Sequence, residues 1–197
     1  MKRAVTLIFM LAAGTMSSAC PVSLEQSGTI TLTRTDPYFS VVMENSRQGL
    51  KESRVMERDG QTERVTTYYG HPLITTKRTD AKGTLNLVYA KPLDDLNRLP
   101  EVRVWKSDVA LKVGSRTASR GTMTVLYLGE QVEEVGDCEY DVWMAQTKLE
   151  LEGASTNAFN MRFSPELGLV LRATRLDEKN YPVSYVGYDE IIEGRVE

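Results

Sequence analysis

The stretch that decides the fold class, residues 136–175, reads GDCEYDVWMAQTKLELEGASTNAFNMRFSPELGLVLRATR. Its first part is apolar at every second position from Cys138 to Met144. A period of two is typical of a strand that buries one face. After a turn-rich segment the alternation returns in residues 159–163, and after a second turn it returns in residues 169–173. Three successive strands joined by turns predict an antiparallel, all-β chain.

Two details of the first strand carry further expectations. The apolar phase changes by one position near residues 146–148, and a β-bulge there would turn every later side chain to the other face. Trp143 lies opposite in phase to Cys138, Tyr140 and Val142. A large aromatic side chain on the less apolar face indicates that both faces are covered, or that one face lines a groove.

The rest of the chain repeats this pattern of short alternating runs and turns. Asp59-Gly60 lies between two such runs and predicts a hairpin over residues 50–69, because both central positions of a type I′ turn need positive φ. Residues 122–128 and 132–135 are expected as separate strands. Residues 92–100 are the one helical segment, with proline at each end.

The sequence contains about ten to twelve short strands at near-regular spacing, which is typical of all-β sandwiches and barrels. We predict an all-β, mainly antiparallel fold: a strongly curved meander sheet, a barrel or half-barrel, with one short helix. A β-sandwich is the alternative. We see no linker, repeat or low-complexity tract, so residues 20–197 are expected to form a single antiparallel β domain.

Residues 1–19 have the features of a secretory signal peptide. Lys2 and Arg3 precede an apolar run, and small residues end at Ala19. The mature chain then has 22 basic and 27 acidic residues, a net charge of −5, and no transmembrane segment of about 18 apolar residues. Its basic residues are scattered, which argues against a nucleic-acid partner. The expected location is the periplasm, or outside the cell.

The chain has two cysteines, Cys20 and Cys138, and they admit two interpretations. We predict a disulfide between them, because an exported compartment is oxidising and the count is even. The alternative is lipidation of Cys20, which would anchor the protein to the outer membrane. The preceding Ser17 is not the aliphatic residue that a lipoprotein signal normally has at that position.

Residues with chemical potential are few. His71 is the only histidine, and its catalytic use in a secreted hydrolase is an alternative; no Gly-x-Ser-x-Gly motif accompanies it. We predict no catalytic residue, no metal site and no cofactor. In a curved sheet, aromatic side chains can line a ligand cavity, although most are core residues. The candidates are Tyr89, Trp105, Tyr127 and Trp143.

The segment from Phe163 to Val170, with Ser164-Pro165 and Gly168 in its turn, resembles the C-terminal hairpin of β-rich periplasmic proteins of the lipoprotein-carrier half-barrel superfamily. The resemblance implies a concave apolar sheet and carries over no catalytic residue. We therefore expect an exported envelope protein, a non-catalytic binding or support module that holds an apolar ligand, such as a lipid, or an envelope protein. A purely structural envelope lipoprotein is a further alternative.

Overall fold

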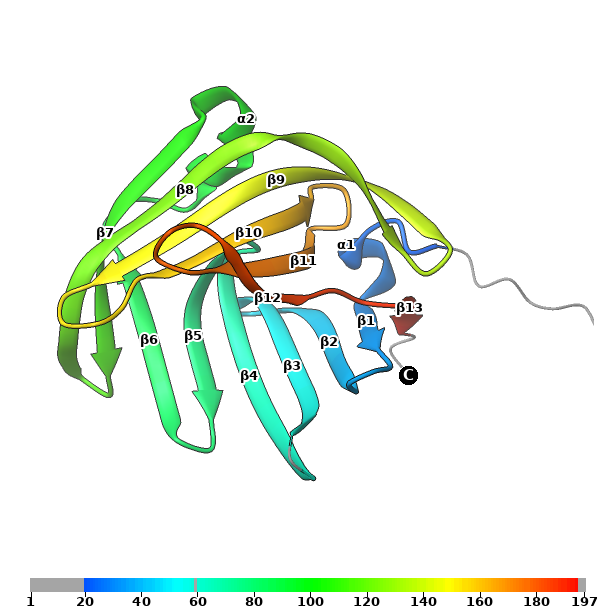
Figure 1. Ribbon diagram of the computed structural model, residues 1–197, viewed down its shortest axis with the longest axis horizontal. Coiled ribbons are helices and arrows are strands. Elements are labelled where there is room, and N and C mark those ends of the chain that lie inside the picture. The colour runs from blue at the N-terminus through cyan, green and yellow to red at the C-terminus, as the bar shows by residue number, and fades with distance from the viewer. Residues whose placement is uncertain (1–19, 59, 195–197) are drawn as a thin grey trace, which may run out of the picture.

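The computed structural model describes residues 20–58 and 60–194 (Figure 1). The expected signal peptide, residues 1–19, lies outside the described residues. The strands of the described part are β1 (Thr29–Arg34), β2 (Phe39–Ser46), β3 (Gly49–Arg58), β4 (Gln61–His71), β5 (Ile74–Asp80), β6 (Gly83–Tyr89), β7 (Val104–Val113), β8 (Arg116–Val135), β9 (Cys138–Leu151), β10 (Asn157–Ser164), β11 (Leu169–Leu176), β12 (Pro182–Val186) and β13 (Glu190–Gly194). The short helical elements are α1 (Leu24–Ser27), the 3-10 turn η1 (Asp94–Arg98) and α2 (Leu99–Val102).

These strands form one 13-stranded antiparallel sheet in which β1 to β12 are neighbours in chain order. The prediction of an all-β antiparallel meander is confirmed, and the alternative of two packed sheets is not what is seen. The expected hairpin is also present: β3 and β4 pair from Leu50 with Tyr69 to Arg58 with Gln61. Gly60 in its turn has φ of 71°, the positive value that the Asp-Gly pair predicts.

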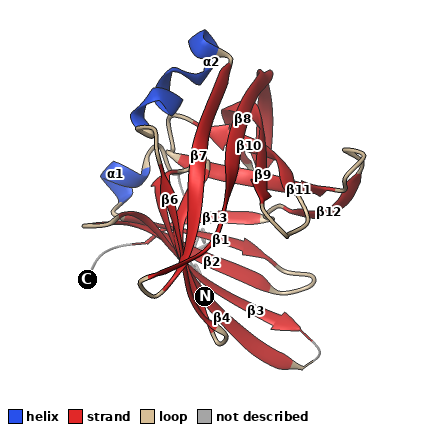
Figure 2. Ribbon diagram, turned by 90° about the vertical axis from the view of Figure 1, so that its left-hand side faces the viewer, coloured by secondary structure: helices blue, strands red, loops and turns tan. Residues whose placement is uncertain are grey.

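The sheet curls until its two edges face each other. β13 pairs with β1 and so stands at the opposite edge from β12, yet only residues 187–189 connect them. Because a chain spans at most about 3.6 Å per residue, this link reaches no further than roughly 14 Å. A hydrogen bond of 3.4 Å from Arg34 to the Tyr185 carbonyl also ties β1 to β12. The result is a strongly curved, open sheet (Figure 2).

Two hydrophobic cores pack against this sheet. The β1–β2 core includes Leu32, Val41, Val142 and Leu169. The other, which we call the β7–β8 core, consists of Leu73, Ile74, Leu96, Leu99, Trp105, Met123, Val125, Ala145 and Phe163. The helical segment closes the β7–β8 core, since Leu96 and Leu99 are fully buried. Pro100 lies in the first turn of α2 rather than ending the helix.

Strand β9 contributes to both cores, and this explains its change of phase. Val142 packs into the β1–β2 core, whereas the next residue, Trp143, packs against the β7–β8 core on the other face. The pairing of β9 with β10 is continuous from residue 143 to 149. The prediction of a bulge near residues 146–148 is therefore wrong. No residue is inserted there; instead, the face of β9 that packs against a core changes along the strand. Both faces are covered, as the phase of Trp143 indicates.

The register shift lies instead in the partner strand. β8 is a single strand of 20 residues, and its pairing with β9 shifts between Tyr127 and Gly129. The extra residue, Leu128, reverses the phase of the residues that follow. Residues 122–128 and 132–135, expected as two strands, belong to one, because residues 129–131 interrupt the apolar pattern without ending the strand.

Candidate ligand cavity

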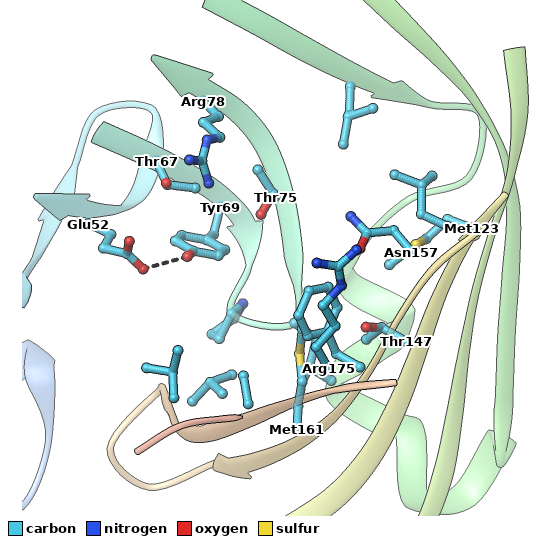
Figure 3. A pocket seen from close by; sticks show the side chains of 18 of the residues that line it. Glu52, Thr67, Tyr69, Thr75, Arg78, Met123, Thr147, Asn157, Met161 and Arg175 are labelled. Atoms are coloured by element: carbon cyan, nitrogen blue, oxygen red, sulfur yellow. Dashed lines mark hydrogen bonds between the residues drawn. The ribbon is translucent and has the colours of Figure 1, made fainter. Parts of the chain in front are cut away.

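A cavity of about 510 Å³ lies on the concave side of the sheet, between the two cores (Figure 3). Its volume is within the roughly 300–1,000 Å³ of small-molecule sites. Most of the lining is apolar or aromatic: Met43, Leu50, Pro72, Leu73, Leu85, Leu87, Tyr89, Leu111, Met123, Leu149, Leu151, Phe159, Met161, Val170, Ala173, Tyr185, Val186 and Tyr188. These side chains come from both walls of the curved sheet, so its curvature creates the cavity.

The cavity runs from a buried end to an exposed one. Leu73 and Met123 line it and are buried, with exposed fractions of 2% and 7%. Leu85 and Tyr185 also line it, but their exposed fractions are 44% and 60%. An apolar chain could therefore enter at the side of Leu85 and Tyr185 and bury its far end against the β7–β8 core.

A polar cluster on β3 and β4 forms part of the cavity wall. Glu52 and Arg54 point to the same side of β3 because side chains two apart share a face. The Tyr69 hydroxyl donates a hydrogen bond of 2.6 Å to Glu52 Oε2, as Figure 3 shows. Arg54 Nη2 lies 2.6 Å from Glu52 Oε1. This contact is a charge pair without hydrogen-bond geometry, since Oε1 has no hydrogen-bond partner.

The charges in this cluster compensate each other. Glu52 is buried, with an exposed fraction of 4%. Burial opposes a charge on Arg54, but the Glu52 carboxylate overrides it and raises the Arg54 pKa above its ordinary value. The Arg54 guanidinium also lies over the Phe39 ring, 5.1 Å from its centroid. Burial and the Glu52 charge raise the pKa of Tyr69 as well, so its hydroxyl stays protonated and keeps donating.

This cluster is not evident from the sequence. Residues 50–58 read as a charged strand, LKESRVMER. The available signal was the alternation of Leu50, Glu52, Arg54 and Met56, in which two charged residues continue an apolar face. Only the pairing with β4 shows that these charges point inwards, because Glu52 stands opposite the buried Thr67.

Two further arginines point into the cavity, Arg78 of β5 and Arg175 of β11, whereas Lys77 stands opposite Tyr68 and points with it to the other face of the sheet. Lys77 Nζ lies 5.1 Å from the centroid of the Tyr68 ring. Arg78 lies 3.4 Å from the Asp80 carboxylate. Arg175 is exposed and, within residues 20–58 and 60–194, has no ion pair. Arg78 and Arg175 are called the basic mouth.

The four aromatic candidates lie in different places. Tyr89 lines the cavity, and its hydroxyl donates to the Thr75 carbonyl at 2.9 Å. Trp105 lies in the β7–β8 core, with its ring nitrogen donating to the Pro92 carbonyl at 3.2 Å. Trp143 packs edge-on against both Tyr127 and Phe163. Neither tryptophan nor Tyr127 is among the lining residues, so three of the four are packing residues around the cavity rather than in its wall.

His71 is buried at the end of β4. Its Nδ1 accepts a hydrogen bond of 3.2 Å from the Leu73 backbone N–H, and its ring packs against Phe163. Burial lowers the pKa of His71 to about 4, although the Asn97 side chain opposes the shift. Among the described residues His71 forms no hydrogen bond with a serine or carboxylate. It lines a second cavity of about 350 Å³ that shares Leu50, Tyr69 and Pro72 with the first.

Cys20 and Cys138 form a disulfide, with their Cα atoms 5.6 Å apart. The predicted pairing is confirmed. The bridge fastens the segment before α1 to the start of β9, where Cys138 is buried in the β1–β2 core. Leu24 of α1 holds the same segment, donating its backbone N–H to the Leu167 carbonyl at 3.2 Å. A disulfide indicates an oxidising compartment.

Buried charge outside the cavity is concentrated at Glu133 of β8. Its carboxylate forms ion pairs with Arg162 of β10 and Arg172 of β11, the latter at 2.6 Å. Glu133 has an exposed fraction of 3%. This ion-pair cluster links three neighbouring strands, so both arginines already have a carboxylate partner.

Comparisons with known proteins give no match: no family model, no curated protein and no solved structure is similar enough to this chain to be reported. Within the part of the chain that the structure describes, no helix has the length and apolarity to cross a membrane. The same residues contain no group of three or more His, Cys, Asp or Glu side chains arranged to hold a metal ion.

Proposed function

We propose that the protein is an exported, non-catalytic binding protein of the cell envelope that holds an apolar ligand chain in its concave cavity. The observation that carries the proposal is the cavity of about 510 Å³ with a mostly apolar lining. Burying hydrocarbon against such a lining is favourable by about 0.8 kcal/mol per CH₂ group. The disulfide supports export, and the resemblance of the Phe163–Val170 turn supports a carrier role.

No observation favours the alternative of a hydrolase that uses His71. A general base needs a pKa near the working pH and a hydrogen-bonded partner. The pKa of His71 is lowered to about 4, and its Nδ1 is already engaged by the backbone of Leu73. A purely structural envelope protein is separated from a binding protein by whether the cavity takes up a ligand.

The proposal is tested with a series of saturated fatty acids, measured by calorimetry on the mature protein. Laurate, myristate and palmitate differ by two methylenes at each step. If the tail is buried, each step should tighten binding by up to roughly fourteenfold, from about 1.6 kcal/mol. Affinities that do not change along the series, or no binding by any of the three, would contradict a buried tail.

A pair of variants tests whether the cavity is the binding site. Ala173 lines the cavity, whereas its neighbour Thr174 is not among the lining residues. Ala173→Trp should fill part of the cavity and weaken palmitate binding at least tenfold, because overpacking removes the space for the tail. Thr174→Trp, the matched control, should bind as the wild type does. Equal affinities of the two variants would place the ligand elsewhere.

A further inference from the structure

The charge around the cavity differs from that of the whole chain. The full sequence has a net charge of −3. Of the charged side chains that point into the cavity, three are basic (Arg54, Arg78 and Arg175) and one is acidic (Glu52). The single acid, Glu52, forms its charge pair with Arg54 at 2.6 Å. The charge of the cavity lining is therefore positive, in a protein whose overall charge has the opposite sign.

Arg175 is the clearest member of this mouth. On the same strand, Arg172 is paired with Glu133, as is Arg162 on the neighbouring strand. Arg175 instead points beside Asn157 and Thr147, which are uncharged (Figure 3). Two arginines of this region thus have an internal carboxylate, and the one that lines the cavity has none among the described residues.

The other wall of the mouth is formed by Arg78. Its Nε lies 3.4 Å from Asp80 Oδ2, and the other oxygen of Asp80 accepts the Lys82 backbone N–H at 2.9 Å. Arg78 on β5 and Arg175 on β11 approach the cavity from different walls (Figure 3). Each wall of the cavity therefore offers an arginine to an anion.

We infer that the ligand is an anionic amphiphile, with one apolar tail in the cavity and a carboxylate or phosphate head at the basic mouth. This inference rests on the proposed binding function. Arginine presents a planar fork that matches both head groups, and charge-assisted hydrogen bonds are stronger than neutral ones. Apolar side chains flank the mouth, since Leu85 pairs with Arg78 and Tyr185 follows Ser184, the partner of Arg175.

The test compares three amphiphiles with the same tail: palmitate, palmityl alcohol and cetyltrimethylammonium. Binding is measured by calorimetry at low salt and again at physiological salt. The variants are Arg78→Gln/Arg175→Gln and the control Arg64→Gln, whose exposed side chain neighbours the buried Val65 on β4 and does not line the cavity. Circular dichroism checks that each variant folds.

We expect palmitate to bind most tightly, then the alcohol, and cetyltrimethylammonium most weakly. The double variant should lose roughly tenfold or more in palmitate affinity while binding the alcohol unchanged, because only a charged head uses the arginines. Added salt should weaken the binding of palmitate alone, because salt screens interactions between exposed charges, with a screening length of about 8 Å at physiological ionic strength. Arg64→Gln should match the wild type.

Two other outcomes are distinct. If the alcohol binds as tightly as palmitate, or the double variant loses both equally, the inference of an anionic head is overturned and the proposed binding function stands. If none of the three amphiphiles binds, the proposed function fails and the inference fails with it.

Discussion

Replacing Cys20 and Cys138 by alanine removes a bridge between residues 118 apart in the sequence. The bridge restricts the unfolded chain, and the loop-closure expression gives about 5 kcal/mol at 25 °C for a loop of this length. That figure is an upper value, because measured losses on removing native disulfides are about 2–5 kcal/mol. Few native contacts should be lost, because Leu24 and its backbone hydrogen bond to Leu167 still hold α1 in place.

The assay is urea unfolding of the mature protein and of the Cys20→Ala/Cys138→Ala variant, followed by circular dichroism. We expect the variant to unfold at lower urea with a steeper dependence on urea, since its unfolded state is more extended. A reducing agent should lower the midpoint of the wild type to that of the variant and leave the variant unchanged. Equal stability of the oxidised wild type and the variant would refute the reasoning.

Intact mass spectrometry provides an independent check on Cys20. The bridged chain should be two hydrogens lighter than the reduced chain. A gain that corresponds to diacylglyceryl and acyl groups would instead show a lipid anchor, because the disulfide and the thioether need the same sulfur atom.

Three further predictions concern buried groups. Because His71 has a pKa of about 4 when folded and 6.5 when unfolded, the unfolded state binds the extra proton, so stability should fall by roughly 3 kcal/mol as pH drops from 6.5 to 4. Urea titrations at several pH values should show this slope, and His71→Phe should lose it. Gly121→Ala should lower the free energy of unfolding, measured in urea, by about 1–3 kcal/mol, because a Cβ would lie 1.8 Å from the Glu150 carbonyl oxygen. A urea midpoint equal to that of the wild type would contradict this close approach. Glu133→Ala should lower the free energy of unfolding in urea by about 2 kcal/mol, because its two arginines lose their carboxylate. Glu133→Gln should lower it less, because the amide oxygen still accepts a hydrogen bond from an arginine.

The order of the strands and most of their turns could be predicted because they depend on local chemistry. Alternation in residues 159–163 and 169–173 corresponds to β10 and β11, and the hairpin predicted over residues 50–69 corresponds to β3 and β4. The disulfide could be predicted because only two cysteines exist. The strand β13 was not predicted, since residues 190–194 have no clear alternation and are held by pairing with β1.

The sequence by itself thus determined the all-β class, the meander and the disulfide partner, whereas the tertiary structure decided the cavity. Alternation shows that two sets of side chains point to opposite faces, but it does not show what covers each face. Val142 and Trp143 enter different cores only because the curled sheet brings different strands to each side of β9. Glu52 and Arg175 line one cavity although 123 residues separate them. That meeting depends on long-range curvature, which no local pattern of residues encodes.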